Sequence, residues 1–228
     1  MLIIRQLTRR VLQRGQQVVL LDAIDAQLRA GERVALQGKS GAGKSLLLRA
    51  ISGLDPLDAG EVELDGRRLT SDWVCQFRTV VAYVPQRCAL QAGTVRENLV
   101  RAGRLRVHQR MAPHLDPTAA TAEAGLSEDL LDRDVRLLSG GELQWVNLLR
   151  TLQFSPRILL LDEPTAAMDA ATTQRVEAWL LRWQGADARR AWIWVSHDRA
   201  QCERIADRFW EMDRGRLDSY PEIPQPQK

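Results

Sequence analysis

The loop from Gly38 to Ser45 has the residue types and the spacing needed to hold phosphate groups. It reads GKSGAGKS, which matches the pattern G-x4-G-K-[ST]. Its glycines let successive backbone N–H groups turn toward phosphate oxygens, while Lys44 can reach the β- and γ-phosphates of a nucleotide and the Ser45 hydroxyl can bind Mg²⁺. The residues expected to contact the nucleotide here are Gly38, Lys39, Ser40, Gly41, Ala42, Gly43, Lys44, Ser45 and Leu46.

Two acids follow a fully apolar run, at Asp162 and Glu163 after Ile158–Leu161. A carboxylate at the carboxyl end of a parallel strand lies in the crevice where such sheets bind ligands. Asp162 therefore suits Mg²⁺, directly or through water. Glu163 suits a base that polarises an attacking water. The pair predicts hydrolysis of the bound nucleotide.

The segment LSGGE contains a second candidate anion site. Ser139 can cap a helix, and Glu142 three residues later completes a capping box. The same helix start also presents backbone N–H groups to an anion. One nucleotide needs only one such cradle within its own chain.

The elements that must position these residues follow a βα alternation, which predicts a parallel, doubly wound sheet. Strands are expected over 2–7, 17–28, 32–37, 61–64, 80–84, 157–161, 191–195 and 209–212. Helices are expected over 44–51, from 94, over 139–154, 170–183 and 199–206. The chain is interpreted as one domain over 1–228, with a core at about 1–86 and 155–218, an inserted helical subdomain at about 87–154 and a loose tail at about 219–228.

Composition narrows the class of protein. The net charge is +3, too small an excess to indicate a nucleic-acid partner. Cys75, Cys88 and Cys202 form no CxxC pair, which argues against a disulfide framework or a metal cluster and favours a reducing cytosol. No apolar run approaches the roughly 20 residues that span a bilayer. Any membrane-spanning part would then be another chain.

The combined motifs resemble those of ABC ATPases over about 2–217. LSGGE resembles the family's signature motif, and Gln86 after Tyr83-Val84-Pro85 looks like its Q-loop glutamine. Asp169 in AAMD looks like the D-loop aspartate, and His197 in VSHD looks like the switch histidine. The resemblance implies an α/β fold of the P-loop NTPase, ABC type, with an antiparallel N-terminal part.

The resemblance also implies a head-to-tail homodimer with ATP and Mg²⁺ as cofactors. Glu163, His197 and Gln86 would be catalytic, and Ser45, Gln86 and Asp162 would hold Mg²⁺. The signature of the opposite subunit would bind the γ-phosphate through Leu138, Ser139, Gly140, Gly141 and Glu142.

One departure concerns the adenine. The family carries a stacking aromatic in its N-terminal strands, but residues 11–17 contain no Tyr, Phe or Trp. Either the Arg14 guanidinium stacks on the base, or base recognition is weak.

The expected setting is the cytoplasmic face of a bacterial inner membrane, where the chain is peripheral and docks on a separate permease near Gln86–Arg101. The segment Leu149–Pro156 resembles the "R-x-L-Q-F-x-P" stretch of a bacterial two-component iron-export ATPase, which implies iron export. A transporter for another cargo, such as lipoproteins or amino acids, and a soluble ABC ATPase for iron–sulfur assembly remain alternatives.

Overall fold

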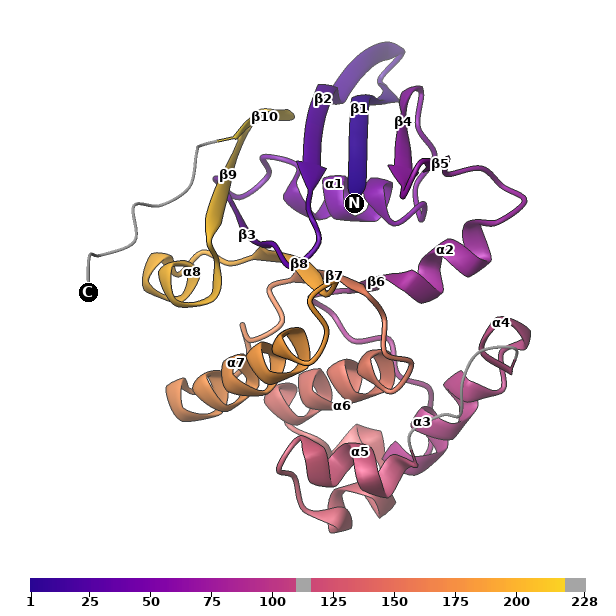
Figure 1. Ribbon diagram of the computed structural model, residues 1–228, viewed down its shortest axis with the longest axis vertical. Coiled ribbons are helices and arrows are strands. Elements are labelled where there is room, and N and C mark those ends of the chain that lie inside the picture. Colours follow the sequence, from indigo (N-terminus) through magenta and orange to yellow (C-terminus); the bar gives the residue numbers. More distant parts are fainter. Residues whose placement is uncertain (110–115, 220–228) are drawn as a thin grey trace.

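The computed structural model describes residues 1–109 and 116–219, which form two β-sheets with helices packed around them (Figure 1). One sheet has four strands in the order β2-β1-β4-β5, and the other has six in the order β10-β9-β3-β8-β7-β6. No helix among the described residues has the length and apolar character needed to cross a bilayer.

The four-stranded sheet is antiparallel and comes from the N-terminal part of the chain. Strands β1 (Leu2–Gln13) and β2 (Gln16–Leu28) form a hairpin around the Arg14-Gly15 turn. Both turn residues have positive φ, 49° and 79°, as a tight hairpin turn of this hand requires. The remaining strands are β4 (Ala59–Leu64) and β5 (Arg67–Arg68).

The six-stranded sheet is parallel except at one edge. Strand β3 pairs in parallel with β8 and β9, and β7 pairs in parallel with β8 and β6. Only β10 runs antiparallel to its neighbour β9. The strands are β3 (Arg33–Gln37), β6 (Val81–Val84), β7 (Ile158–Asp162), β8 (Ala191–Val195), β9 (Arg208–Asp213) and β10 (Arg216–Ser219).

Alternation along the central strands builds two cores on opposite faces of the parallel sheet. In β7, Ile158 and Leu160 pack with the antiparallel sheet and α1, whereas Leu159 and Leu161 pack with the helical side. Strand β8 does the same, with both of its tryptophans on the helical side. All five residues of each strand are buried, which explains their continuous apolar sequences.

Four of the eight described α-helices begin at a capping side chain. Thr94 and Ser139 each complete a capping box, and Asp169 and Asp198 accept hydrogen bonds from backbone N–H groups three residues later. The α-helices are α1 (Lys44–Ile51), α2 (Val74–Val80), α3 (Val95–Gly103), α4 (Arg106–Gln109), α5 (Pro117–Glu123), α6 (Gly140–Leu152), α7 (Ala170–Gly185) and α8 (Arg199–Ile205). Short 3-10 turns lie at Glu128–Asp132 and Val135–Leu137.

The predicted parallel sheet is confirmed, and every predicted strand and helix has a counterpart. Helix α1 has the predicted bounds, whereas β1 extends beyond the predicted end at residue 7 because the hairpin continues to its tight turn. Elements α2, α4, β5 and β10 were not predicted. The described part of the predicted insertion, 87–109 and 116–154, contains helices α3 to α6. Its status as a subdomain stays a prediction, and the predicted tail lies outside the described residues from 220 onward.

Candidate active site

The phosphate loop connects β3 to α1, as the motif requires. Gly38, Gly41 and Gly43 all have positive φ, a backbone region that favours glycine. A Cβ at position 38 would also collide with the carbonyl oxygen of Met212. The loop can therefore curl only because glycines occupy these positions.

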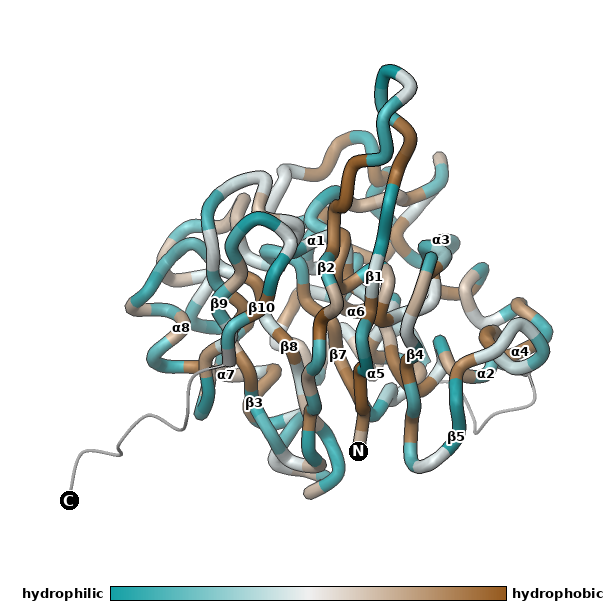
Figure 2. Tube along the Cα trace, turned by 90° about the horizontal axis from the view of Figure 1, so that it is seen from above, coloured by the Kyte–Doolittle hydropathy of each residue, from teal (hydrophilic) through white to brown (hydrophobic). Residues whose placement is uncertain are grey.

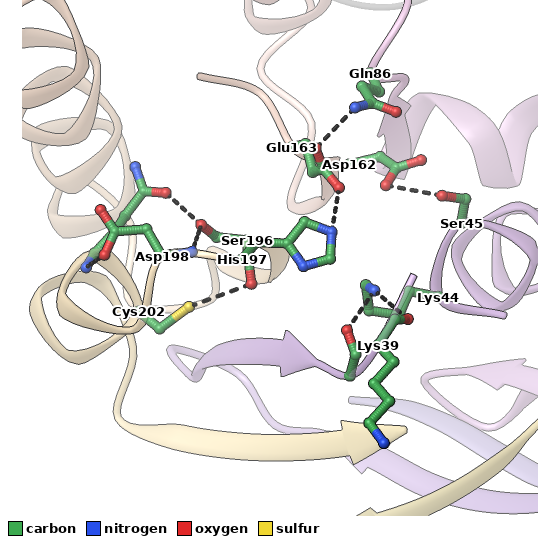
Figure 3. Close-up of polar contacts among 12 residues, drawn as sticks. Lys39, Lys44, Ser45, Gln86, Asp162, Glu163, Ser196, His197, Asp198 and Cys202 are labelled. Carbon is green, nitrogen blue, oxygen red and sulfur yellow. Dashed lines mark hydrogen bonds and ion pairs between the residues drawn. The ribbon is translucent and has the colours of Figure 1, made fainter. Parts of the chain in front are cut away.

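The Lys44 ammonium lies across this loop. Its Nζ donates to the carbonyl oxygens of Gly38, at 2.7 Å, and Lys39, at 3.0 Å (Figure 3). Burial lowers the pKa of Lys44, while the negative charges of Glu163 and Asp162 oppose that shift. The cation is thus placed on the loop and electrostatically linked to both acids.

Helix α1 differs at its start from α3, α6, α7 and α8. Its N-cap is Gly43, in the left-handed conformation, and no side chain caps it. The first N–H groups of a helix have no partner within the helix, and the positive end of the helix dipole lies beside them. The start of α1 is therefore suited to binding a phosphate.

Asp162 lies at the end of β7 and is buried. One carboxylate oxygen accepts a hydrogen bond from the Ser45 hydroxyl at 3.0 Å, and the other accepts from the Tyr83 hydroxyl at 2.9 Å. Burial and the neighbouring Asp162 charge raise the pKa of Tyr83, so the phenol keeps its proton and remains a donor. The structure thus joins two of the three predicted Mg²⁺ ligands, Ser45 and Asp162, and adds an orienting residue. The third, Gln86, donates its hydrogen bond to Glu163 instead.

Glu163 is held between two other predicted catalytic residues. Its carboxylate accepts from Gln86 Nε2 at 2.7 Å and lies 2.9 Å from His197 Nε2 (Figure 3). The three come from the ends of neighbouring strands β6, β7 and β8. Glu163 also has a positive φ of 47°, an uncommon conformation for a non-glycine residue that is often found at functional sites.

The signature segment starts α6 as predicted. Ser139 Oγ accepts from the Glu142 N–H at 3.3 Å, and Glu142 accepts from the Ser139 N–H at 2.8 Å. Side chains at positions 140 and 141 would press against Ala167, since an added Cβ would lie 3.2 Å from its atoms. Within residues 1–109 and 116–219, no hydrogen bond links Leu138–Glu142 to the phosphate loop of the same chain.

The remaining predicted residues lie elsewhere. Arg14 occupies the tip of the β1–β2 hairpin, which projects from the body of the molecule (Figure 2). Asp169 caps α7, where it accepts from the Thr172 N–H at 2.7 Å. Leu46 is partly buried and packs against the core on the α1 side. The assigned roles of Arg14 and Asp169 toward a nucleotide stay predictions.

Two residues that hold the site together, Tyr83 and Gln144, were not predicted. Tyr83 was noted only as part of the context of Gln86. Gln144 is buried in α6, and its Nε2 lies 3.2 Å from the Gln86 carbonyl oxygen and 3.4 Å from that of Glu163. Its Oε1 also accepts from the Ala167 N–H at 3.4 Å. In the sequence, the position of Gln144 two residues after LSGGE is the feature that could have pointed to it.

Comparison with known proteins identifies the class. The ABC transporter family model matches residues 21–166. YjkB of Bacillus subtilis, named as an ABC transporter ATP-binding protein, is 37% identical over 205 residues, which cover 90% of this chain and 80% of YjkB. The aliphatic sulfonates import protein SsuB 1 of Nocardia farcinica is 38% identical over 211 residues, covering 92% and 79%.

Two further similarities concern a longer relative and a solved structure. The sulfate/thiosulfate import protein CysA of Thermosynechococcus vestitus is 36% identical over 202 residues, but the match spans only 57% of CysA. The ATP-binding cassette MJ0796, solved as a post-hydrolysis dimer with ADP and Pi, superposes with a TM-score of 0.84 at 25% identity, covering 98% of this chain and 100% of that one. The chain therefore belongs to the ABC transporter family, as an ATP-binding and ATP-hydrolysing subunit.

Proposed function

We propose that two copies of this chain bind two ATP molecules head to tail and drive a separate membrane permease. The observation that carries the proposal is the pair of helix starts. The uncapped start of α1 lies beside Ser45, Asp162 and Glu163, whereas the glycine start of α6 has no recorded hydrogen bond to that loop in its own chain, within the described residues. The MJ0796 structure, a dimer bound to ADP and Pi, supports a dimer.

Each site residue has a distinct role in this proposal. Lys44 and the start of α1 bind the β- and γ-phosphates, and Ser45 and Asp162 offer the hard oxygen ligands that Mg²⁺ prefers. When bound, Mg²⁺ neutralises charge on the phosphate oxygens. Glu163 polarises the attacking water, and Gln86 and His197 orient its carboxylate from either side.

Replacing Tyr83 by phenylalanine tests the Mg²⁺ assignment. The variant removes the hydroxyl that orients Asp162 but keeps the ring. Loss of such a supporting contact typically weakens metal affinity about 10- to 100-fold, so the Mg²⁺ concentration that gives half-maximal ATPase activity is expected to rise about tenfold. Titration of Mg²⁺ at saturating ATP measures this. An unchanged half-maximal concentration would show that Tyr83 does not support the metal ligand.

The permease-docking surface is proposed at a cavity of about 420 Å³ that overlaps the predicted segment Gln86–Arg101. It lies between the core elements α2 and β6 and the helices α3, α4 and α6. Leu105 lines it and is 56% exposed, and Arg101 and Arg150 add positive charge. A cytoplasmic permease segment with apolar and acidic side chains fits this lining. Tyr83 lines the same cavity.

A negative charge in this cavity should separate the ATPase chain from its permease. We expect Leu105→Glu to lose co-purification with the permease and to abolish transport, because it places a carboxylate on an apolar contact. The ATPase rate of the isolated subunit should remain unchanged. Val19→Glu is the matched control, since Val19 is exposed on β2 and lies outside both the cavity and the segment Gln86–Arg101. Equal loss of co-purification in both variants would argue against the cavity as the docking surface.

The cargo has two candidate classes. Leu149–Pro156 supports iron export, but the compared relatives do not support it, and the names of CysA and SsuB 1 favour import of sulfate or sulfonates. Arg150, Thr151, Phe154 and Pro156 line the docking cavity. The iron-export similarity thus concerns the surface that contacts the permease rather than the hydrolytic site.

A deletion strain separates the two classes. Excess cellular iron under iron load would support export, whereas failure to grow on sulfate or a sulfonate as sole sulfur source would support import. Unchanged iron content excludes the export class.

A further inference from the structure

A group of buried polar side chains lies behind the catalytic residues, in a part of the molecule that the proposed reaction does not use. Gln201 at the start of α8 and Glu177 in α7 are about 95% buried. Buried polar groups are costly unless they are hydrogen-bonded. Their partners therefore indicate what the group holds in place.

The Gln201 amide uses each of its polar atoms. Its Oε1 accepts from the Ser196 hydroxyl at 2.7 Å. Its Nε2 donates to Thr165 Oγ1 at 3.0 Å and to Glu177 Oε1 at 2.9 Å. A neutral amide is the only uncharged side chain of this size that offers an acceptor and two donors. A carboxylate in its place would accept only and would face the Glu177 carboxylate.

These contacts join the two loops that carry the predicted catalytic residues. Thr165 lies two residues after Glu163, in the loop after β7. Ser196 directly precedes His197, in the loop after β8 (Figure 3). The same loop is closed from its other side, because Ser196 Oγ accepts from the Asp198 N–H at 3.0 Å. One amide thus links both loops while the tips of Glu163 and His197 lie 2.9 Å apart.

The far end of the group is anchored by an ion pair. Arg204 donates to both oxygens of Glu177, at 2.9 and 3.1 Å. Glu177 therefore keeps a fixed carboxylate on α7, and Gln201 is positioned against it. The chain of contacts runs from α7 and α8 to the two loops.

We propose that Gln201 is a positioning residue for hydrolysis, which holds the His197 loop in register with the Glu163 loop. The proposal rests on the proposed roles of Glu163 and His197. Gln201 touches no nucleotide in this account and acts only through the spacing of those two side chains. Misplacement of a catalytic group by about 1 Å can slow a reaction about 100-fold.

The test compares Gln201→Glu with the exchange variant Gln201→Glu/Glu177→Gln in the full chain. The single variant puts two carboxylates together and is expected to lower kcat about 10- to 100-fold, with KM for ATP and the ATP-dependent dimer within about twofold of the unaltered chain. The exchange restores one amide and one carboxylate with the direction of their hydrogen bond reversed, and is expected to recover most of kcat. Gln201→Met keeps the volume but makes no hydrogen bond, and it should also lower kcat. The double variant Gln201→Met/Glu177→Gln should not recover it.

Several results would overturn the proposal. A kcat of Gln201→Met equal to that of the unaltered chain would do so. So would a loss of activity that merely follows the folded fraction measured by thermal unfolding, since that is the result of a structural role alone. Failure of the proposed reaction is distinguishable, because Glu163→Gln would then hydrolyse ATP at the unaltered rate whatever Gln201 does.

Discussion

The Glu163→Gln variant is expected to bind ATP but to hydrolyse it about 10²- to 10⁴-fold more slowly than the unaltered chain, the usual contribution of a general base. The amide has nearly the shape of the carboxylate, so contacts with Gln86 and His197 can persist in altered form. It lacks the charge that polarises water. Because the γ-phosphate then stays in place, the ATP-bound dimer should accumulate.

Phosphate release measures the hydrolysis rate, and a nucleotide-binding assay measures the affinity for ATP. Size-exclusion chromatography with ATP detects the dimer. Glu203→Gln is a matched control, since Glu203 is an exposed acid on α8 that pairs with Arg199. It should hydrolyse ATP normally and form no long-lived dimer. Turnover by Glu163→Gln at the unaltered rate would show that Glu163 is not the base.

The second large effect is complementation between two inactive variants. Lys44→Ala removes the cation on the phosphate loop and should lose nucleotide binding. Ser139→Asp keeps a good cap for α6 but places a negative charge where the γ-phosphate of the opposite subunit is expected. Each variant alone should be inactive. Their equimolar mixture should regain about a quarter of the normal rate, because half of a random mixture is heterodimer with one intact site in two.

Ser139→Asn is the control for shape, since it caps the helix without the charge and should retain more activity than Ser139→Asp. A mixture no more active than its separate components would argue against sites shared between subunits. Full activity of Ser139→Asp alone would show that the signature segment does not contact the γ-phosphate.

The parts of the fold that the sequence predicted are those in which local pattern and tertiary environment agree. Strands β7 and β8 are buried on both faces, so their continuous apolar sequences were unambiguous. Helix α2 was missed because it is only seven residues long with two of them buried, which leaves almost no periodic signal. Short edge elements such as β10 depend on their neighbour rather than on their own sequence.

In the site, too, residues in local motifs were predicted, and residues that act through distant contacts were not. Ser45, Gln86, Asp162, Glu163 and His197 were predicted because each lies in a short motif. The structure brings Ser45 into contact with Asp162, and both Gln86 and His197 into contact with Glu163. Residues that support them through contacts far apart in sequence left no local pattern. Tyr83 and Asp162 are 79 positions apart, and Gln144 and Gln86 are 58 apart. The role of Arg14 stays a prediction, since it depends on a base held by the surrounding fold.

Tyr83 has a consequence for the control of turnover. Its ring borders the docking cavity, while its hydroxyl holds the carboxylate of Asp162. An aromatic ring is rigid, so a displacement of the ring would also move the hydroxyl that contacts Asp162. If the permease docks in this cavity, as proposed, movement of the Tyr83 ring on docking would reach the Asp162 carboxylate, and the hydrolysis rate would then respond to the partner.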